Sequence, residues 1–366
     1  MIKMMQDGIE GLRRRRMLLV SAGLGLQAVL SRAASPAVFP VPGPLNEPAG
    51  MTSRAAHSVL TCVVRAGDRL VAMGERGLVV LSDDGGRQWR QARVPVSVTL
   101  TSASFVDARQ GWMVGHGGVV LHTADGGENW ALQIDGLALA KAALVQAQAL
   151  PESAAGRQRS VQQAQRLVDD GADKPLLSVR FVDDQRGMAV GAYGLATTTG
   201  DGGKTWVPCM DRLPNPQGLH LYVVVSNGTN WVIAGEQGVL MHSGNDAASF
   251  EPLASPFQRS FFAATATRNG GFALAGLLGS ACRIEAGAAV VAPIPLPAPL
   301  TILSCTELHD GRVMLLAQGG RLLVSSDGGV AFSEQQLPRR GQLTSLAEAP
   351  DGGLVATSLG GVARLS

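Results

Sequence analysis

Short runs of alternating apolar and polar residues, separated by glycine-rich turns, fill most of this chain. Residues 99–134 show the pattern clearly and predict four strands, at 101–106, 112–114, 119–122 and 130–134. Strands this short, joined by turns of a few residues, form a small antiparallel sheet. The 46 glycines and the charged fraction of only 16% suit a fold built from many short strands and tight turns.

This unit repeats along the chain. One glycine of each repeat follows the second predicted strand, and these glycines stand at 77, 118, 194, 238, 279, 320 and 361. Most of the intervals are equal, whereas the interval from 118 to 194 is nearly twice as long. A period of about 40 residues with four strands per repeat is typical of a β-propeller. We therefore expect an all-β fold, a seven-bladed propeller with four-stranded antiparallel blades over 57–366.

The turn between the third and fourth strands carries a recurrent motif, Ser/Thr-x-Asp-x-Gly-x-x-Trp/Phe, which we call the Asp-box turn. Its Asp can accept hydrogen bonds from turn amides, its glycine permits positive φ, and its aromatic residue can anchor the turn. We predict a structural role for the Asp and aromatic residues of four copies: Asp84 and Trp89, Asp125 and Trp130, Asp201 and Trp206, Asp327 and Phe332. A fifth copy, at 243–250, is decayed.

The long interval between the second and third repeats contains an insert, roughly 137–173. It is rich in alanine, is interrupted at Pro151, and places Val161, Ala164, Leu167 and Val168 on one helical face. We expect a helical hairpin or one long helix with a break, between blades 2 and 3. It is either a decoration packed on the ring or a moving lid or partner-binding arm.

The last repeat has only three predicted strands, at 343–349, 354–357 and 362–365. An unpaired edge strand is a liability for a folded protein. Residues 34–56 are therefore predicted to be a linker and a ring-closing strand, in which part of 37–56 pairs with 362–365.

The N-terminal segment, 1–33, resembles an export signal. Four arginines at 13–16 precede an apolar stretch, 17–30, that is short for a bilayer span, and Ser31-Arg32-Ala33 supplies small residues for cleavage. The arginine run fits both a twin-arginine and a general secretory signal. We expect an exported protein, periplasmic and soluble after signal cleavage; an uncleaved anchor is the alternative.

Charge and cysteine content narrow the function. Segment 1–33 carries a net charge of +4 and the whole chain +2, so the remainder is mildly acidic, which disfavours nucleic-acid partners. The four cysteines, at 62, 209, 282 and 305, have no metal-binding spacing. Either they are small buried residues or some are paired, with 282 and 305 the first pair to test. No metal or cofactor is predicted, and we expect a monomer.

The turn between the second and third strands is the candidate partner-binding surface. It lies on the face of the ring opposite the Asp-box turns, and its non-glycine residues differ most between repeats. These residues are Glu75, Arg76, His116, Tyr193, Glu236 and Gln237. The alternative is that they are ordinary solvated turn residues.

The motifs resemble those of the photosystem II stability/assembly factor family. The resemblance rests on Phe105-Val-Asp107, Gly111-Trp112, Gly115-x-x-Gly118 and the Asp-box turn at 123–130, with a second copy from Phe181. It covers about 57–366. It implies a seven-bladed, exported, non-catalytic propeller whose photosynthetic members hold membrane-protein assembly intermediates. The helical insert and the decayed or missing Asp-box turns of blades 4 and 5 depart from the family pattern.

Two other functions fit an Asp-box propeller. One is binding of a glycan or small ligand in the central channel. The other is sialidase-like glycoside hydrolysis, for which Tyr193 or Tyr222 would be the nucleophile and Glu75 with Glu236 the carboxylates. The Arg-Ile-Pro opening typical of sialidases is missing, because Glu285 follows Arg283-Ile284. A scaffold that binds a membrane-protein partner is therefore the preferred interpretation.

Overall fold

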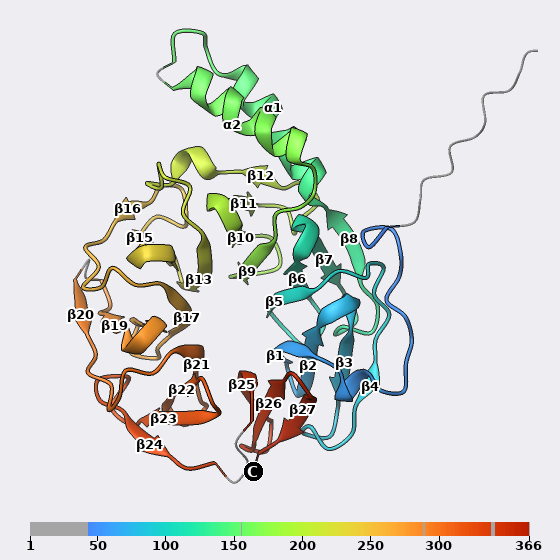
Figure 1. The fold of residues 1–366 in the computed structure, drawn as a ribbon, viewed down its shortest axis with the longest axis vertical. Helices are drawn as coiled ribbons and strands as arrows, with labels where there is room; N and C mark the ends of the chain where they lie inside the picture. The colour runs from blue at the N-terminus through green and yellow to red at the C-terminus, as the bar shows by residue number, and fades with distance from the viewer. Residues whose placement is uncertain (1–42, 155, 288–289, 338–340, 366) are drawn as a thin grey trace, which may run out of the picture. The chain divides into compact units, whose positions relative to one another are not determined.

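The computed structural model describes residues 43–366, except 155, 288–289, 338–340 and 366. In this part the chain forms seven antiparallel sheets arranged as blades around a ring (Figure 1), six with four strands and one with three. The predicted seven-bladed β-propeller is therefore confirmed. The predicted signal, 1–33, and the first part of the predicted linker lie outside the described residues.

The strands follow the chain order blade by blade. Blades 1 and 2 contain β1 (Leu60–Ala66), β2 (Arg69–Gly74), β3 (Val79–Ser82), β4 (Arg90–Gln91), β5 (Leu100–Phe105), β6 (Gly111–Gly115), β7 (Val120–Thr123) and β8 (Ala131–Ile134). Blades 3 and 4 contain β9 (Leu176–Phe181), β10 (Gly187–Gly191), β11 (Ala196–Thr199), β12 (Val207–Pro208), β13 (Leu221–Asn227), β14 (Asn230–Gly235), β15 (Leu240–Ser243) and β16 (Glu251–Pro252). Blades 5, 6 and 7 contain β17 (Phe261–Ala266), β18 (Phe272–Gly276), β19 (Ala281–Ile284), β20 (Val291–Pro293), β21 (Ile302–Glu307), β22 (Val313–Ala317), β23 (Arg321–Ser325), β24 (Ser333–Gln335), β25 (Leu343–Glu348), β26 (Leu354–Ser358) and β27 (Gly361–Arg364).

Each blade contributes alternate residues to the two neighbouring interfaces. On β6, Trp112 and Val114 pack towards blade 3, whereas Met113 packs towards blade 1. Side chains of successive strand residues point to opposite sides of a sheet, so a strand buried on both sides reads as a continuous apolar run. Trp112 is fully buried and stacks on Phe181 of blade 3 with ring centroids 3.6 Å apart. The core of the ring is therefore divided into seven inter-blade clusters.

The Asp-box turns form repeated hydrogen-bonded loops between the third and fourth strands of a blade. In blade 2, Asp125 accepts the amide of Asn129 (3.0 Å) and the hydroxyl of Thr123 (2.8 Å), and Thr123 accepts the amide of Gly127 (2.9 Å). Trp130 is buried and donates its indole N–H to the Gly127 carbonyl at 3.0 Å. The hydroxyl and carboxylate thus satisfy turn amides that would otherwise lack partners.

The other copies repeat this arrangement. Corresponding hydrogen bonds to the Asp carboxylate occur at Asp84, Asp201 and Asp327. Trp89 caps its own turn, Trp206 donates to Gln133 of blade 2 instead, and Phe332 is buried. The decayed copy in blade 4 keeps the same turn, because Asn245 accepts from Ser243 and Ser249 and Ala247 adopts positive φ.

The insert is a helical hairpin, α1 (Gly136–Ala149) and α2 (Arg157–Asp170), which projects outward from blades 2 and 3 (Figure 1). The Asp135 carboxylate accepts the Ala138 amide at 2.8 Å and caps α1. The two helices pack through three buried alanines, Ala143, Ala147 and Ala164. These small side chains let the helices approach closely, which explains the alanine-rich composition of the insert.

Blade 7 closes the ring without a fourth strand among the described residues. Residues 43–56 form no strand pairing with β27. Residues 43–54 run along blade 1, where Ala49 donates its amide to Val94 and Ser97 donates to Pro44, and the 3₁₀ turn η1 (Ala55–His57) contacts β27 without pairing with it. The predicted ring-closing strand is therefore wrong for 43–56, while 37–42 lie outside the described residues. The prolines at 44 and 48 lack a backbone N–H to donate to a neighbouring strand, which disfavours strand pairing here.

Side-chain contacts between blades 7 and 1 hold the two ends of the ring together. The β25 hydroxyl of Thr344 donates to the Leu60 carbonyl at 2.7 Å. On the Asp-box side, Arg364 donates to the Gly85 carbonyl at 2.6 Å and pairs with Asp351 at 2.9 Å, and Asp351 also pairs with Arg87. These contacts surround an apolar cluster shared by the two blades.

Candidate partner-binding face

The turns after the second strands form short 3₁₀ segments in five blades: η2 (Glu75–Gly77), η3 (His116–Gly118), η4 (Ala192–Gly194), η6 (Glu236–Gly238) and η7 (Leu277–Gly279). We call the surface that carries them the turn face. Each segment ends at one of the repeating glycines. A Cβ added to Gly238, at φ +80°, would lie 2.0 Å from the Phe257 carbonyl oxygen, so only glycine fits beside the incoming chain of the next blade.

The middle residue of each turn adopts a left-handed backbone conformation, even where it is not glycine. Arg76, Tyr193, Gln237 and Leu278 have φ between 50° and 56°. This region costs an L-residue about 1–2 kcal/mol, and such outliers persist where the surrounding structure imposes them. The conformation turns the side chains away from the ring, and Tyr193 and Leu278 are 63% and 52% exposed. These four positions therefore display side chains on the turn face.

The structure brings some predicted site residues together through a residue that the sequence analysis missed. His220 lies just before β13, and its Nδ1 accepts the Tyr193 amide at 2.8 Å. Its own amide donates to the Glu236 carboxylate at 3.0 Å, and its Nε2 lies 4.0 Å from that carboxylate. Because Nδ1 is the acceptor, the neutral ring carries its proton on Nε2, facing Glu236.

Aromatic rings link His220 and Tyr193 to further side chains, so that the contacts span three blades. The ring of Tyr193 packs edge-on against His220 at 4.8 Å, His220 lies 6.1 Å from Tyr222, and Tyr222 lies 5.2 Å from Phe262. We call these four residues the aromatic row. It contains both tyrosines of the chain and runs from η4 of blade 3 to β17 of blade 5. The alignment of strand starts between repeats was the signal that could have identified His220 and Phe262.

The remaining predicted residues stand apart from the aromatic row. Glu75 and Arg76 are on blade 1 and His116 is on blade 2, and all three side chains are exposed. Gln237 is exposed next to Glu236, and its backbone N–H donates to the Ser260 hydroxyl at 3.3 Å. Within the described residues, no side-chain hydrogen bond or ion pair joins Glu75, Arg76 or His116 to the row.

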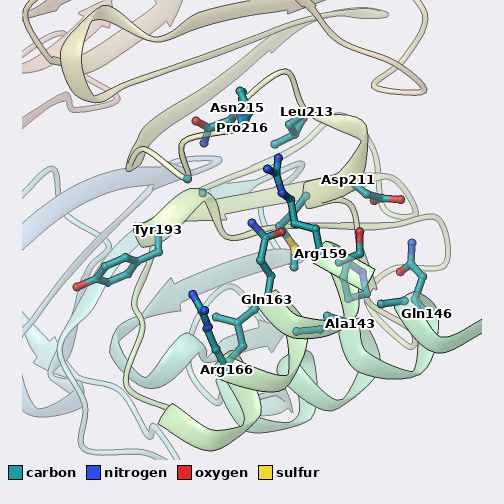
Figure 2. A pocket seen from close by; sticks show the side chains of 18 of the residues that line it. Ala143, Gln146, Arg159, Gln163, Arg166, Tyr193, Asp211, Leu213, Asn215 and Pro216 are labelled. Carbon is teal, nitrogen blue, oxygen red and sulfur yellow. The ribbon is translucent and has the colours of Figure 1, made fainter. Parts of the chain in front are cut away.

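A cleft opens where the hairpin meets blade 3. It has a volume of 410 Å³ and is lined by α1, α2, Tyr193 and Gly194 of η4, and the loop after β12 (Figure 2). Its walls combine alanine, methionine and leucine side chains with arginine and glutamine. Sites that bind small ligands or peptide side chains commonly measure roughly 300–1,000 Å³. Tyr193 belongs to both the cleft and the aromatic row, so the two are continuous.

The pKa shifts and the cysteines limit the chemistry that is available near this face. Burial, followed by the nearby Glu236 carboxylate, raises the pKa of Tyr222, so its phenol stays protonated at neutral pH. The four cysteines are free thiols, and burial raises the pKa of Cys209 and Cys282 to about 12. In the described part of the chain, no group of three or more His, Cys, Asp or Glu side chains could hold a metal ion.

No helix within the described ranges is long and apolar enough to cross a membrane. Comparison with curated proteins finds no match.

A family model described as photosynthesis system II assembly factor YCF48 matches residues 59–144 and 158–255, which together make up half of the chain.

Solved structures share the fold at low identity. A structure titled YCF48 bound to D1 peptide is 15% identical, with a TM-score of 0.58, over 85% of this chain and 94% of its own. YCF48 from Cyanidioschyzon merolae is 17% identical, with a TM-score of 0.58, over 86% and 97%. The WD40 propeller of Doa1 is 12% identical, with a TM-score of 0.59, over 88% and 95%. The structural likeness shows the propeller fold, and the family model shows that this chain belongs to the YCF48 family of assembly factors.

Proposed function

We propose that this protein is an exported, non-catalytic scaffold that binds a segment of a membrane protein on its turn face while that partner is assembled. The observation that carries the proposal is the aromatic row, in which rings from three blades are in contact, from the exposed Tyr193 on the turn face through three half-buried rings. Tyrosine and other aromatic side chains supply large contact areas at low cost in conformational entropy, and they dominate many protein interfaces.

Membership of the YCF48 family supports an assembly role. A relative with the same fold has been solved with a bound D1 peptide, so a propeller of this kind can hold a peptide segment. The N-terminal arginines and apolar stretch support export, which would place the turn face on the side of the membrane where exposed loops of a partner emerge.

The chemistry of the face favours binding over catalysis. A tyrosine nucleophile needs a general base within hydrogen-bond reach, and among the described residues no hydrogen bond joins the hydroxyl of Tyr193 or Tyr222 to a carboxylate. The proposed carboxylate pair is also unsuited to hydrolysis, because Glu75 is on blade 1, whereas Glu236 is on blade 4 and accepts the His220 amide. Two catalytic carboxyl groups must instead face one bond across a short gap.

Co-purification tests this proposal. The tagged full-length protein is expressed in its source organism, fractionated, and recovered from gently solubilised membranes with its partner. We expect recovery from the exported fraction, and at least a tenfold loss of partner with the double variant Tyr193→Ala/Phe262→Ala. Val330→Ala is the matched control, because it removes a 45% exposed apolar side chain from the Asp-box turn of blade 6.

Thermal unfolding of each variant checks that the ring remains folded. Wild-type protein recovered alone from the membrane fraction would contradict the proposal. Equal loss of partner with Val330→Ala would also contradict it, because binding would then not depend on the turn face. Retention in the cytoplasmic fraction would refute the exported location.

A further inference from the structure

The cleft between the hairpin and blade 3 carries two arginines with no partner among the described residues. Arg159 and Arg166 are exposed on α2 and line the cleft, with Gln163 between them. The spacing of four and three residues places all three side chains on one helical face. Figure 2 shows Arg159 and Gln163 rising from α2 towards the loop that contains Leu213 and Asn215, whereas Arg166 reaches up on the side of Tyr193. The neighbouring Arg157 differs, because it donates to the carbonyls of Leu150 and Gln148.

None of the described carboxylates around the cleft forms an ion pair with Arg159 or Arg166. Lys174 is bound to Asp170 at 2.7 Å and to Asp173 at 2.8 Å, so these two carboxylates pair with the ammonium and not with the arginines. Asp211 lies on the opposite wall, and its carboxylate points away from the two guanidinium groups in Figure 2.

The rest of the cleft suits an extended chain. Ala147, Ala164 and Leu213 are buried and line it beside Met210 and Pro216, so apolar side chains contribute to both the helical wall and the facing wall of the cleft. At its end nearest the ring, the ammonium of Lys174 lies 5.3 Å from the centre of the Tyr193 ring. From there the aromatic row leads on across blades 4 and 5, the surface to which the proposed function assigns the partner.

We propose that this cleft binds an extended acidic peptide segment of the partner, with its carboxylates on Arg159 and Arg166 and its apolar residues on the apolar walls and the aromatic row. This inference rests on the proposed function and names the chemistry of the segment recognised. Guanidinium groups bind carboxylates through paired hydrogen bonds, which gives such a site both affinity and orientation.

The geometry also sets the spacing of the acidic residues. Seven residues of helix separate Arg159 from Arg166 by about 10 Å along the axis of α2. An extended peptide rises about 3.3 Å per residue, so carboxylates about three residues apart match the two arginines. Carboxylates on two adjacent residues would lie too close together to bind both guanidinium groups at once. The preferred ligand therefore has acidic residues about three positions apart, with apolar residues between and beyond them.

Fluorescence anisotropy with a labelled synthetic peptide tests the inference on the intact protein. The probe peptide carries two glutamates three positions apart in a leucine- and alanine-containing segment; one comparison peptide has the glutamates adjacent, and another has lysines in their place. We expect the spaced acidic peptide to bind at least fivefold more tightly than the adjacent one, with affinity that falls as salt rises. The lysine peptide should not bind.

Charge reversal on the hairpin supplies the matched comparison. Arg159→Glu/Arg166→Glu should weaken the acidic peptide at least tenfold and should gain binding of the lysine peptide. Lys141→Glu is the control, because Lys141 is exposed on α1, does not line the cleft, and undergoes the same change of charge per residue. It should change affinity by less than about twofold.

Several results would overturn the inference: equal binding of acidic and lysine peptides, no effect of the double reversal, or the same loss with Lys141→Glu. Binding of anionic lipid vesicles in place of the peptide would overturn it as well. Co-purification separates the two proposals. If Tyr193→Ala/Phe262→Ala loses the partner while Arg159→Glu/Arg166→Glu retains it fully, the acidic-segment inference fails and the proposed function stands.

Discussion

Substitution of Gly238 in blade 4 tests the reason for the repeating glycines. Gly238 has φ +80°, and an added Cβ would lie 2.0 Å from the Phe257 carbonyl oxygen, whereas ordinary contact begins at 3.4 Å. Gly228, in the β13–β14 turn of the same blade, has φ +61° with nothing within 4 Å of an added Cβ. The pair therefore separates the cost of a left-handed backbone from the cost of a clash with the next segment.

Gly228→Ala should lower the free energy of unfolding by about 1 kcal/mol. Left-handed backbone costs about 1–2 kcal/mol for an L-residue, and the lower entropy of the unfolded chain offsets about half of that. Gly238→Ala carries the same two effects and adds a clash with a backbone atom that cannot rotate away. Overpacking of this kind costs about 1–3 kcal/mol, so the total should be about 2–4 kcal/mol.

Urea unfolding followed by tryptophan fluorescence and circular dichroism measures the difference. The midpoints of the two variants are compared at equal slope, and coincidence of the two probes checks cooperativity. A difference between Gly238→Ala and Gly228→Ala below about 0.5 kcal/mol, the usual scatter of substitutions that meet no strain, would refute the reasoning. It would mean that the chain before β17 moves aside at no cost and that backbone conformation alone selects the glycine.

Two further predictions concern ring closure and acid stability. Arg364→Ala should lower the free energy of unfolding by about 1 kcal/mol, because the hydrogen bond to the Gly85 carbonyl is lost, and Arg364→Lys should restore part of it; no change in urea midpoint would show that this contact does not hold blades 7 and 1 together. Hydrogen bonds from Thr205 lower the pKa of Asp201 to about 2, so its contribution to stability is complete above the unfolded value near 4 and is lost as pH falls towards 2. Asp201→Asn should flatten the fall in thermal midpoint over that range, and an unchanged pH profile would contradict this.

Much of the propeller could be predicted from the sequence because its determinants are local. Alternation along each strand, the glycine after each second strand and the Asp-box turn all act over short stretches of chain. The predicted strands of blade 2 agree closely with β5 to β8. The helical insert was also predictable, since its composition and the break at Pro151 are local properties.

The error in ring closure has a different cause. The requirement for a paired edge is real, but the sequence does not show which contacts satisfy it. In blade 7, Arg364 and Thr344 bind backbone carbonyls of blade 1, at the other end of the propeller sequence. A shared apolar cluster adds to this contact. These interactions depend on the curvature of the whole ring, so no local pattern identifies them.

The sequence by itself therefore determined the number of blades, their turns and the position of the insert, because repetition of a local pattern is sufficient to specify them. Only the tertiary structure decided which side chains meet. His220 joins Tyr193 to Glu236 because blades 3 and 4 pack side by side, and the hairpin forms a cleft because it folds back beside blade 3. Such contacts join residues that are separated along the chain, and their geometry is set by how rigid blades pack against one another.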